Sequence, residues 1–277
     1  MFGNVGSHCV GLKKRRSYLI TGLLYRYIAL KKYFFFATKP VDPQRRLSGI
    51  NVNELRPEIV LSGENRKNCI NNFKLYRPAK RQTDEVTGKA AVLVPLCMYK
   101  GELGLLYTLR STKLNTNKGQ VSFPGGMYDK TDKTLEETAI RETWEELRIP
   151  KEKIDVWASG NPMGRNQVSV LPVLCYIGNI EPSELQLNVD EVEEAFVLTL
   201  HDLCDPTNFR YTQFRDSFTL PTYFAGKHRV WGLTAAITHI VMKSLIPNVY
   251  KHKLSYNKSH GVLKTRVLCT QTFIQYS

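Results

Sequence analysis

The sequence predicts an α+β domain in which a mixed β-sheet is sandwiched between helices. Short runs rich in apolar and β-branched residues recur through the middle of the 277-residue chain, as expected of strands. Two longer segments, residues 134–147 and 230–245, have the apolar spacing of helices. Strand and helix patterns do not alternate as a repeated unit. The order therefore favours a mixed sheet with packed helices over a sheet of repeated strand–helix pairs.

The strand patterns differ from one another in their flanking residues. The expected strands are residues 90–99, 103–110, 119–126, 154–158, 168–177, 195–200 and 218–224. The first two are separated by Lys100-Gly101, a turn dipeptide, and are expected to form a hairpin. The third is expected to end in a tight turn at Gly125-Gly126, because two adjacent glycines permit backbone angles that other residues avoid.

The helix patterns place apolar residues on one side of each segment. The expected helices are residues 62–76, 134–147 and 230–245, with one helical turn at 201–204. Ile70 and Phe73 lie on one side of the first helix, and Leu135 and Ala139 form an apolar stripe on the second. Trp231 opens the apolar third helix, so we expect its ring in the core rather than as a platform for a purine base.

Positive charge is concentrated at the two ends of the chain. The formal net charge is +14, yet all 25 acidic residues lie between Asp42 and Leu245, where basic residues nearly balance them. Charge confined to the ends is weak evidence for a nucleic-acid face, and none is expected. The expected organisation is a basic extension at 1–41, a linker with a short helix at 42–84, the α+β domain at 85–246 and a basic tail at 247–277.

Residues 1–41 interleave basic with apolar and aromatic residues and contain no acid. This is the composition of a mitochondrial presequence, which predicts a mitochondrial location. A disordered basic extension is the alternative. A membrane span is not expected, because Arg26 interrupts an apolar run that is already shorter than the roughly 20 residues a bilayer requires.

Six cysteines are spread singly along the chain, without a CxxC pair. A zinc ribbon or a thioredoxin-type motif is therefore not expected. The low cysteine density favours reduced thiols in an intracellular compartment over a secreted disulfide scaffold.

The helix at 134–147 carries three glutamates on one face. Glu142, Glu145 and Glu146 stand at positions i, i+3 and i+4. Like charges at this spacing destabilise a bare helix, and a hard divalent cation such as Mg²⁺ or Mn²⁺ would offset that cost. Arg141 is adjacent and is placed to hold one carboxylate through a bidentate pair. The alternative is an ordinary solvated, glutamate-rich face.

The segment before this helix favours a phosphate-binding site over a solvated face. Gly125-Gly126 would bring backbone N–H groups towards the same cation and towards substrate phosphates. Arg110 and Lys118, which lie at the two ends of the loop between the expected strands 103–110 and 119–126, are the candidate phosphate-binding cations, together with Arg229. Each of these cations is equally compatible with an ordinary exposed side chain.

These residues resemble the Nudix box, whose pattern is GX5EX7REUXEEXGU with U an aliphatic residue. The REUXEE core is matched by Arg141, Glu142, Glu145 and Glu146, and the last aliphatic position by Ile149. The chain departs from the pattern at three positions: Met127 stands for the first Gly, Lys133 for the first Glu with Asp132 beside it, and Arg148 for the Gly that ends the helix. A left-handed cap formed by arginine costs about 1 kcal/mol relative to glycine.

The sequence before the box resembles the coenzyme A diphosphatase branch of this family. Residues 105–111 (LLYTLRS) and 119–126 (GQVSFPGG) resemble its signature, roughly LLxTxRS…R…GxxxFPGG, although Asn115 stands where the branch usually has Arg. The resemblance spans about residues 90–245. It implies a Nudix fold and metal-dependent hydrolysis of the diphosphate bond in coenzyme A and acyl-CoA, giving 3′,5′-ADP and (acyl-)4′-phosphopantetheine.

The resemblance also implies roles for individual residues. Glu142 and Glu146 would ligate Mg²⁺ or Mn²⁺, with Glu145 as a further ligand or a holder of water. Arg141 and Glu145 are the expected catalytic residues, and Gly125 and Gly126 with Arg110 and Lys118 are expected to bind substrate. Glu191 is a second candidate for the general base, although an acidic residue in an acidic run is more often a surface group.

Two other functions stay open. One is a Nudix pyrophosphatase for ADP-ribose or a dinucleotide, which would share the glutamate helix but would leave the upstream signature unexplained. The other is a catalytically silent Nudix module in a mitochondrial assembly, with its basic ends on RNA. The intact REUXEE carboxylates argue against the second. A small-molecule substrate is therefore the expected partner.

Overall fold

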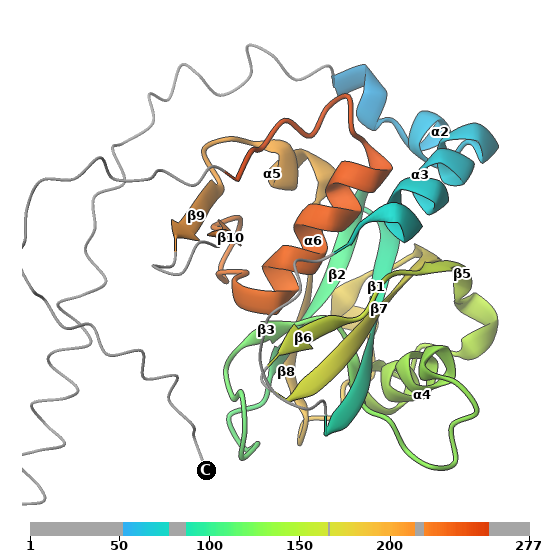
Figure 1. The fold of residues 1–277 in the computed structure, drawn as a ribbon, viewed down its shortest axis with the longest axis vertical. Helices are drawn as coiled ribbons and strands as arrows, with labels where there is room; N and C mark the ends of the chain where they lie inside the picture. Colours follow the sequence, from blue (N-terminus) through green and yellow to red (C-terminus); the bar gives the residue numbers. More distant parts are fainter. Residues whose placement is uncertain (1–51, 78–86, 166, 214–218, 255–277) are drawn as a thin grey trace, which may run out of the picture. The chain divides into compact units, whose positions relative to one another are not determined.

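The structure is a computed structural model that describes residues 52–77, 87–165, 167–213 and 219–254 (Figure 1). Its elements follow in this order: η2 (Val52–Leu55), α2 (Pro57–Val60), α3 (Gly63–Leu75), β1 (Gly88–Tyr99), β2 (Glu102–Arg110), β3 (Val121–Ser122), β4 (Gly125–Met127), α4 (Leu135–Leu147), η3 (Lys151–Lys153), β5 (Asp155–Ser159), β6 (Met163–Arg165), β7 (Val168–Asn179), η4 (Pro182–Glu184), β8 (Val192–Thr199), α5 (Leu200–Cys204), β9 (Phe209–Gln213), β10 (Thr219–Tyr223) and α6 (Gly232–Leu245). The expected 1–41 extension lies outside the described residues.

The main sheet is mixed, as the sequence predicts. β1 pairs in parallel with β7 and in antiparallel with β2, which confirms the hairpin, while β4 pairs with the start of β1. β8 lies along the other edge of β2, from Gly104 to Arg110. The parallel pair β1–β7 is covered on both faces, and this explains why its strands read as nearly continuous apolar runs.

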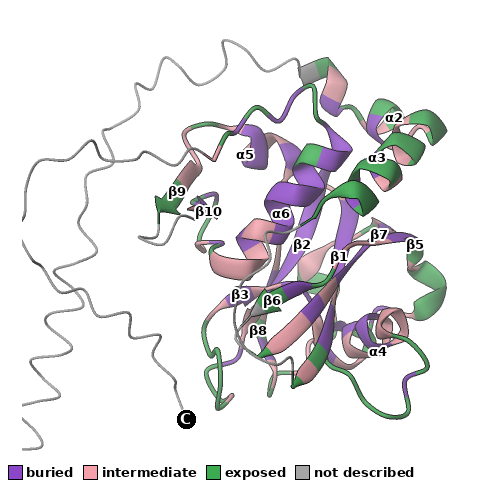
Figure 2. Ribbon diagram, viewed as in Figure 1, coloured by how far each residue is buried: buried purple, intermediate pink, exposed green. Residues whose placement is uncertain are grey.

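Helices cover both faces of this sheet, and each face has its own core (Figure 1). Successive side chains of β2 alternate between them. Leu105 and Tyr107 join the larger cluster with α3 and α6, whereas Leu106 joins the smaller cluster with α4. The strands between the two layers are mostly buried (Figure 2). The expected α+β sandwich is therefore confirmed.

α3 is packed into the same body as the sheet. Ser62 caps its first turn by accepting a hydrogen bond from the Asn65 N–H, and Phe73 and Cys69 are buried. The Asn65 side-chain amide donates to the carbonyl of Leu245 at the end of α6, at 3.1 Å. The short helix expected in the 42–84 segment is thus present and is anchored to the closing helix.

Four cysteines lie in the described residues, and all are free and buried: Cys69, Cys97, Cys175 and Cys204. Burial raises the pKa of the Cys69 and Cys97 thiols to about 12, so these groups are protonated and unreactive at neutral pH. None of the helices in the described ranges combines the length and the apolar character that crossing a bilayer demands.

Some elements differ from the prediction. β6 and β9 were not expected: β6 has three residues, too few for a periodic pattern, and β9 is mostly exposed and polar. Gly125 and Gly126 lie in the short strand β4, not only in a turn.

The core position expected for Trp231 is wrong, since this residue is 42% exposed, with the Arg229 guanidinium 5.3 Å from the centre of its ring. Trp231 is the N-cap of α6 and therefore precedes its apolar stripe.

A buried polar cluster fastens the segment after α6 to the rest of the domain. The Tyr250 hydroxyl contacts the Tyr223 hydroxyl at 2.5 Å and His239 Nδ1 at 2.7 Å. The His252 ring stacks on Phe209 with centroids 4.2 Å apart. Burial lowers the pKa of His239 and His252 to about 4, so both rings are neutral in the folded protein at pH 7.

We expect this cluster to make the fold acid-sensitive. A histidine in the unfolded chain takes up a proton near pH 6.5, whereas the folded pKa is about 4, so protonation favours the unfolded state as the pH falls from 6.5 towards 4. Between pH 7 and pH 5 each histidine should remove about 1–2 kcal/mol of stability. Urea unfolding of His252→Gln, whose amide can still donate to the Leu203 carbonyl, should show a smaller loss at pH 5 than the unmodified chain. An equal loss in both proteins would contradict the role of His252 in the acid sensitivity.

Candidate functional site

Two glycines bring β4 close to the central strand and to α4. Gly125 has a φ of +150°, and a Cβ there would collide with the Ala91 carbonyl of β1. A Cβ on Gly126 would lie 2.5 Å from the Glu142 carboxylate. The doubled glycine therefore leaves space for the strand backbone at the first position and for a glutamate of α4 at the second.

α4 turns a buried face to the sheet and a carboxylate edge to β4. Thr134 caps its start by accepting from the Glu137 N–H, and Ala139 and Leu147 are buried against the sheet. Arg148 ends the helix in the left-handed conformation, with φ of 55°. The unusual arginine cap predicted from the sequence is thus confirmed.

Three carboxylates converge beside β4. Ligand oxygens of Glu142, Glu146 and Glu191 all lie within 4.8 Å of one another. Glu146 is only 2% exposed, and its Oε2 has no hydrogen-bond partner among the described residues. Burial raises the pKa of the Glu146 carboxyl to about 8 and also raises the pKa of Glu142. A hard divalent cation prefers such oxygen ligands and would offset both the repulsion and the cost of burial, so the residues fit a metal site.

Glu145 is placed differently from the other two glutamates of the REUXEE core. Its carboxylate is 45% exposed and accepts a hydrogen bond from Arg141 Nη1 at 3.0 Å. The structure therefore brings Glu142 and Glu146 together as the sequence predicts, but the third carboxylate beside them comes from Glu191.

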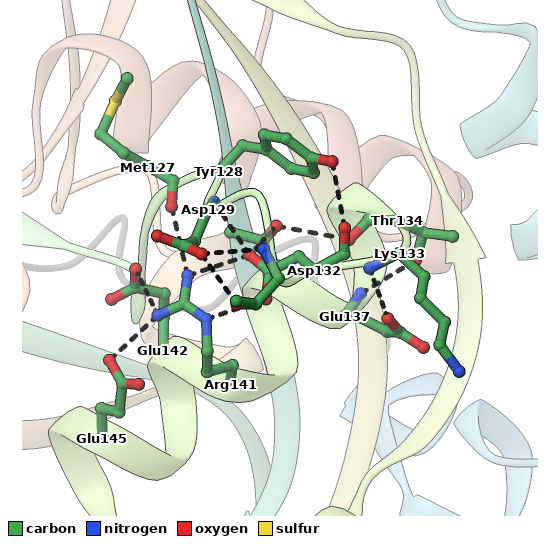
Figure 3. Close-up of polar contacts among 12 residues, drawn as sticks. Met127, Tyr128, Asp129, Asp132, Lys133, Thr134, Glu137, Arg141, Glu142 and Glu145 are labelled. Carbon is green, nitrogen blue, oxygen red and sulfur yellow. Dashed lines mark hydrogen bonds and ion pairs between the residues drawn. The ribbon is translucent and has the colours of Figure 1, made fainter.

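Arg141 is the centre of a network of oxygen acceptors (Figure 3). Its Nε and Nη2 donate to the two oxygens of Asp132, at 2.9 and 3.1 Å, and Nη2 also reaches the Met127 carbonyl. Its Nη1 lies 3.0 Å from Glu142 Oε1. The guanidinium beside Asp132 holds the pKa of that carboxyl well below its usual range. Arg141 thus connects the loop before α4 to the carboxylates on the helix.

Asp132 occupies the place that the general Nudix pattern gives to a glutamate one residue later. Its side chain is 5% exposed and also accepts from the Thr138 hydroxyl at 2.8 Å. Lys133, the residue at the pattern position, points away from Arg141 in Figure 3, and its backbone N–H donates to Glu137. The one-residue shift is accommodated in the loop, so the departure at Lys133 leaves Arg141 with an acidic partner.

The candidate phosphate-binding cations differ in position. Arg110, at the end of β2, lowers the pKa of Glu146 through its charge, and its Nε is buried with no hydrogen-bond partner in the part of the chain that the structure describes. Arg110 therefore lies next to the carboxylate cluster. Lys118 is exposed on the loop between β2 and β3. Gly125 contributes a backbone N–H that faces the Glu146 carboxylate and lowers its pKa.

Glu191 reaches the cluster because the loop before β8 is attached to the end of β2. The Ser111 N–H donates to the Glu191 carbonyl at 2.8 Å, and the Ser111 hydroxyl donates to the Val189 carbonyl. The pairing of Arg110 with Val192 continues this attachment into the sheet. The sequence suggested Glu191 as a possible base but favoured a surface position. The pairing of β8 with β2 places Glu191 beside the other two carboxylates, and no local sequence pattern indicates this pairing.

Comparisons with known proteins identify relatives of this chain. The model of the NUDIX domain family matches residues 87–219. Over 172 residues the chain is 44% identical to "Mitochondrial coenzyme A diphosphatase NUDT8" of Mus musculus, covering 60% of this chain and 82% of that protein. It is also 44% identical to the Homo sapiens protein of the same name, covering 60% and 73%, and 33% identical to "Nudix hydrolase 3" of Caenorhabditis elegans, covering 59% and 76%. Among solved structures, a C. elegans Ap4A hydrolase binary complex is 25% identical, covers 42% of this chain and 82% of that chain, and has a TM-score of 0.35.

Proposed function

The chain belongs to the Nudix hydrolase family, and from this membership we propose that it hydrolyses the diphosphate bond of coenzyme A and its acyl esters. The proposal rests on the group of Glu142, Glu146 and Glu191 beside the double-glycine strand, in which a buried carboxylate oxygen has no hydrogen-bond partner within the described ranges. Such a group is suited to a divalent cation and a phosphoanhydride.

Two further observations support coenzyme A as the substrate. The mouse and human relatives at 44% identity are both named coenzyme A diphosphatases. The segment that resembles the coenzyme A branch, residues 105–126, contributes Arg110 and Gly125, which lie beside the carboxylate group. The proposed products are 3′,5′-ADP and 4′-phosphopantetheine, or its acylated form.

The proposed roles follow from where each side chain lies. Glu142, Glu146 and Glu191 would hold Mg²⁺ or Mn²⁺. Such a cation neutralises charge on the diphosphate and lowers the pKa of a bound water. Arg110, which lies beside the carboxylate group, would place its positive charge near a substrate phosphate, and Lys118 would meet a more distant anionic group from its exposed loop.

We assign proton acceptance from the attacking water to Glu145. Its carboxylate is 45% exposed and lies outside the group that would hold the cation, while Arg141 keeps it oriented at 3.0 Å. Arg141 is therefore assigned to orient both Glu145 and Glu142, rather than to contact substrate.

The direct test is a substrate panel with product masses. Free coenzyme A, acyl-CoA, ADP-ribose and a diadenosine polyphosphate are incubated with the full-length chain, with Mg²⁺, Mn²⁺ or excess chelator. We expect metal-dependent release of 3′,5′-ADP and the highest kcat/KM for a coenzyme A substrate. A higher kcat/KM for ADP-ribose or the dinucleotide would identify a different Nudix pyrophosphatase. Absence of metal-stimulated hydrolysis together with salt-sensitive RNA binding would identify a silent module.

We also propose a mitochondrial location. Both curated relatives at 44% identity are named mitochondrial, and residues 1–41 have the composition of a presequence. Within this proposal the hydrolase domain of residues 85–246 also includes α3 and residues 247–252, which pack against it, and the basic tail follows them. A fluorescent fusion of the whole chain should accumulate in mitochondria, and deletion of residues 1–41 should abolish that accumulation. Unchanged accumulation would contradict the targeting role.

The doubled glycine permits a paired test of the site. Gly126→Ala places a Cβ against the Glu142 carboxylate, a side-chain end that can move, so we expect roughly a 10–100-fold loss of kcat with little change in melting temperature. Gly125→Ala meets the main chain of β1 instead, so we expect a loss of stability by about 2 kcal/mol or more. Thermal unfolding and hydrolysis rates of both variants check the contrast. Full activity of Gly126→Ala would contradict the role given to Glu142.

A further inference from the structure

Asn188 connects α4 to Glu191 through both its main chain and its side chain. Its N–H donates to the Glu146 carbonyl at 2.9 Å, in the last turn of α4, where helix carbonyls have no partner within the helix. Its side-chain Nδ2 donates to Glu191 Oε1 at 2.9 Å. Its own carbonyl accepts from the N–H groups of Glu191 and Val192. One residue thus contacts two of the three carboxylate-bearing residues of the site.

Glu191 requires a stabilising contact because the neighbouring carboxylates of Glu142 and Glu146 repel its own carboxylate. It comes from a loop, whereas Glu142 and Glu146 are fixed on a helix. Oxygens of the Glu142, Glu146 and Glu191 carboxylates lie within 4.8 Å of one another, so the three negative charges repel one another. A glutamate on a loop that is free to rotate would relieve this repulsion by turning towards solvent, and it would gain side-chain entropy in doing so.

The other contacts that the described residues make with this loop reach its main chain or the Asp190 side chain, and not the Glu191 carboxylate. Ser111 binds the carbonyls of Val189 and Glu191, and Lys113 pairs with Asp190 at 2.8 Å. Among the described residues, the Asn188 amide is the donor recorded for the Glu191 carboxylate, and a hydrogen bond to a charged acceptor is stronger than a neutral one.

We infer that Asn188 is a positioning residue, whose side-chain amide holds the Glu191 carboxylate towards Glu142 and Glu146 before a cation arrives. The inference rests on the proposed function, because it presumes that these carboxylates receive a divalent cation. Asn188 itself would touch neither cation nor substrate. It would act by removing the cost of bringing Glu191 into place when the cation binds.

The first experiment measures cation binding without substrate. Mn²⁺ is titrated into the full-length chain, and free Mn²⁺ is followed by electron paramagnetic resonance. Asn188→Asp keeps the shape and the Oδ1 acceptor of the Asp190 N–H but replaces the donor with a negative charge, while Asn188→Ala removes the donor without adding charge. We expect the dissociation constant to rise roughly 10–100-fold in both variants. Asp190→Asn, which removes the ion pair with Lys113 from the same loop, is the matched control and should bind Mn²⁺ as the unmodified chain does.

The second experiment separates positioning from a general structural effect. In a Glu191→Gln background the Asn188 amide has no charged acceptor, so adding Asn188→Ala should change the Mn²⁺ dissociation constant less than twofold. An equally large additional loss in that background would show that Asn188 acts through the fold, and would overturn the inference. Unchanged or tighter Mn²⁺ binding by both single variants would overturn it as well.

These results are distinguishable from failure of the proposed function. If Asn188 variants bind Mn²⁺ normally while coenzyme A is still hydrolysed, the positioning role is wrong and the function stands. If the unmodified chain binds Mn²⁺ with the expected dependence on Asn188 but releases no 3′,5′-ADP from coenzyme A, the positioning role stands and the substrate assignment is wrong.

Discussion

Glu146→Gln is expected to lower kcat for diphosphate hydrolysis roughly 1000-fold, equivalent to about 4 kcal/mol of lost transition-state stabilisation. The substitution keeps the shape of the side chain but removes the charge that a cation requires. The fold should stay intact or become more stable, because burial raises the pKa of this carboxyl to about 8 and disfavours its charged form. Steady-state hydrolysis of coenzyme A at saturating Mn²⁺, together with thermal unfolding, measures both effects.

The matched control for this substitution is Glu152→Gln in η3, an exposed residue, which should leave both quantities unchanged. Glu145→Gln is the informative comparison on α4. A drop in kcat with unchanged Mn²⁺ binding would agree with the proton-accepting role proposed for Glu145, whereas a loss of Mn²⁺ binding would make Glu145 a ligand. Activity of Glu146→Gln within tenfold of the unmodified chain would refute the proposed metal site.

Asp132→Ala is expected to lower the free energy of unfolding by about 2–3 kcal/mol and to reduce activity at the same time. The Asp132 side chain is 5% exposed and accepts two hydrogen bonds from Arg141, whose side chain is 28% exposed. Removing the acid leaves this partly buried guanidinium without its main partner. Its remaining contacts are Glu142, Glu145 and the Met127 carbonyl, so its position relative to the carboxylates should change.

Urea unfolding and hydrolysis rates of Asp132→Ala and Lys133→Ala decide which residue fills the acidic position of the motif. Lys133 contributes only a backbone N–H to the recorded contacts of this loop, so Lys133→Ala should be nearly neutral. The reverse ranking, with a costly change at Lys133 and a neutral one at Asp132, would contradict the network in Figure 3.

The elements with their own periodicity were predictable from the sequence. The helix bounds at α4 and α6 and the β1–β2 hairpin follow from local patterns, whereas the left-handed Arg148 cap was expected from the resemblance to the Nudix box. Trp231 was misplaced because an apolar residue at the start of a helix can lie before its buried face, and the pattern does not show where the first turn begins.

The site was only partly predictable, for a different reason. Glu142 and Glu146 share one helical face, so spacing along the sequence brings them together. Glu191 lies 45 residues beyond Glu146 in the numbering and reaches them only because β8 pairs with β2 and Asn188 contacts the end of α4. Spacing within one element carries no information about such a contact. The part of a site contributed by a second, distant element therefore required the structure.

If a divalent cation binds beside the buried Oε2 of Glu146 as proposed, the stability of the folded protein depends on the concentration of that cation. A ligand that binds only the native state adds RT ln(1 + [L]/Kd) to the free energy of unfolding, about 2.7 kcal/mol at a hundredfold excess over Kd. Chelation of the cation would then increase the unfolded fraction of the protein as well as abolish hydrolysis. At low divalent-cation concentration, proteases would therefore degrade more of the protein, in addition to the fall in its hydrolysis rate.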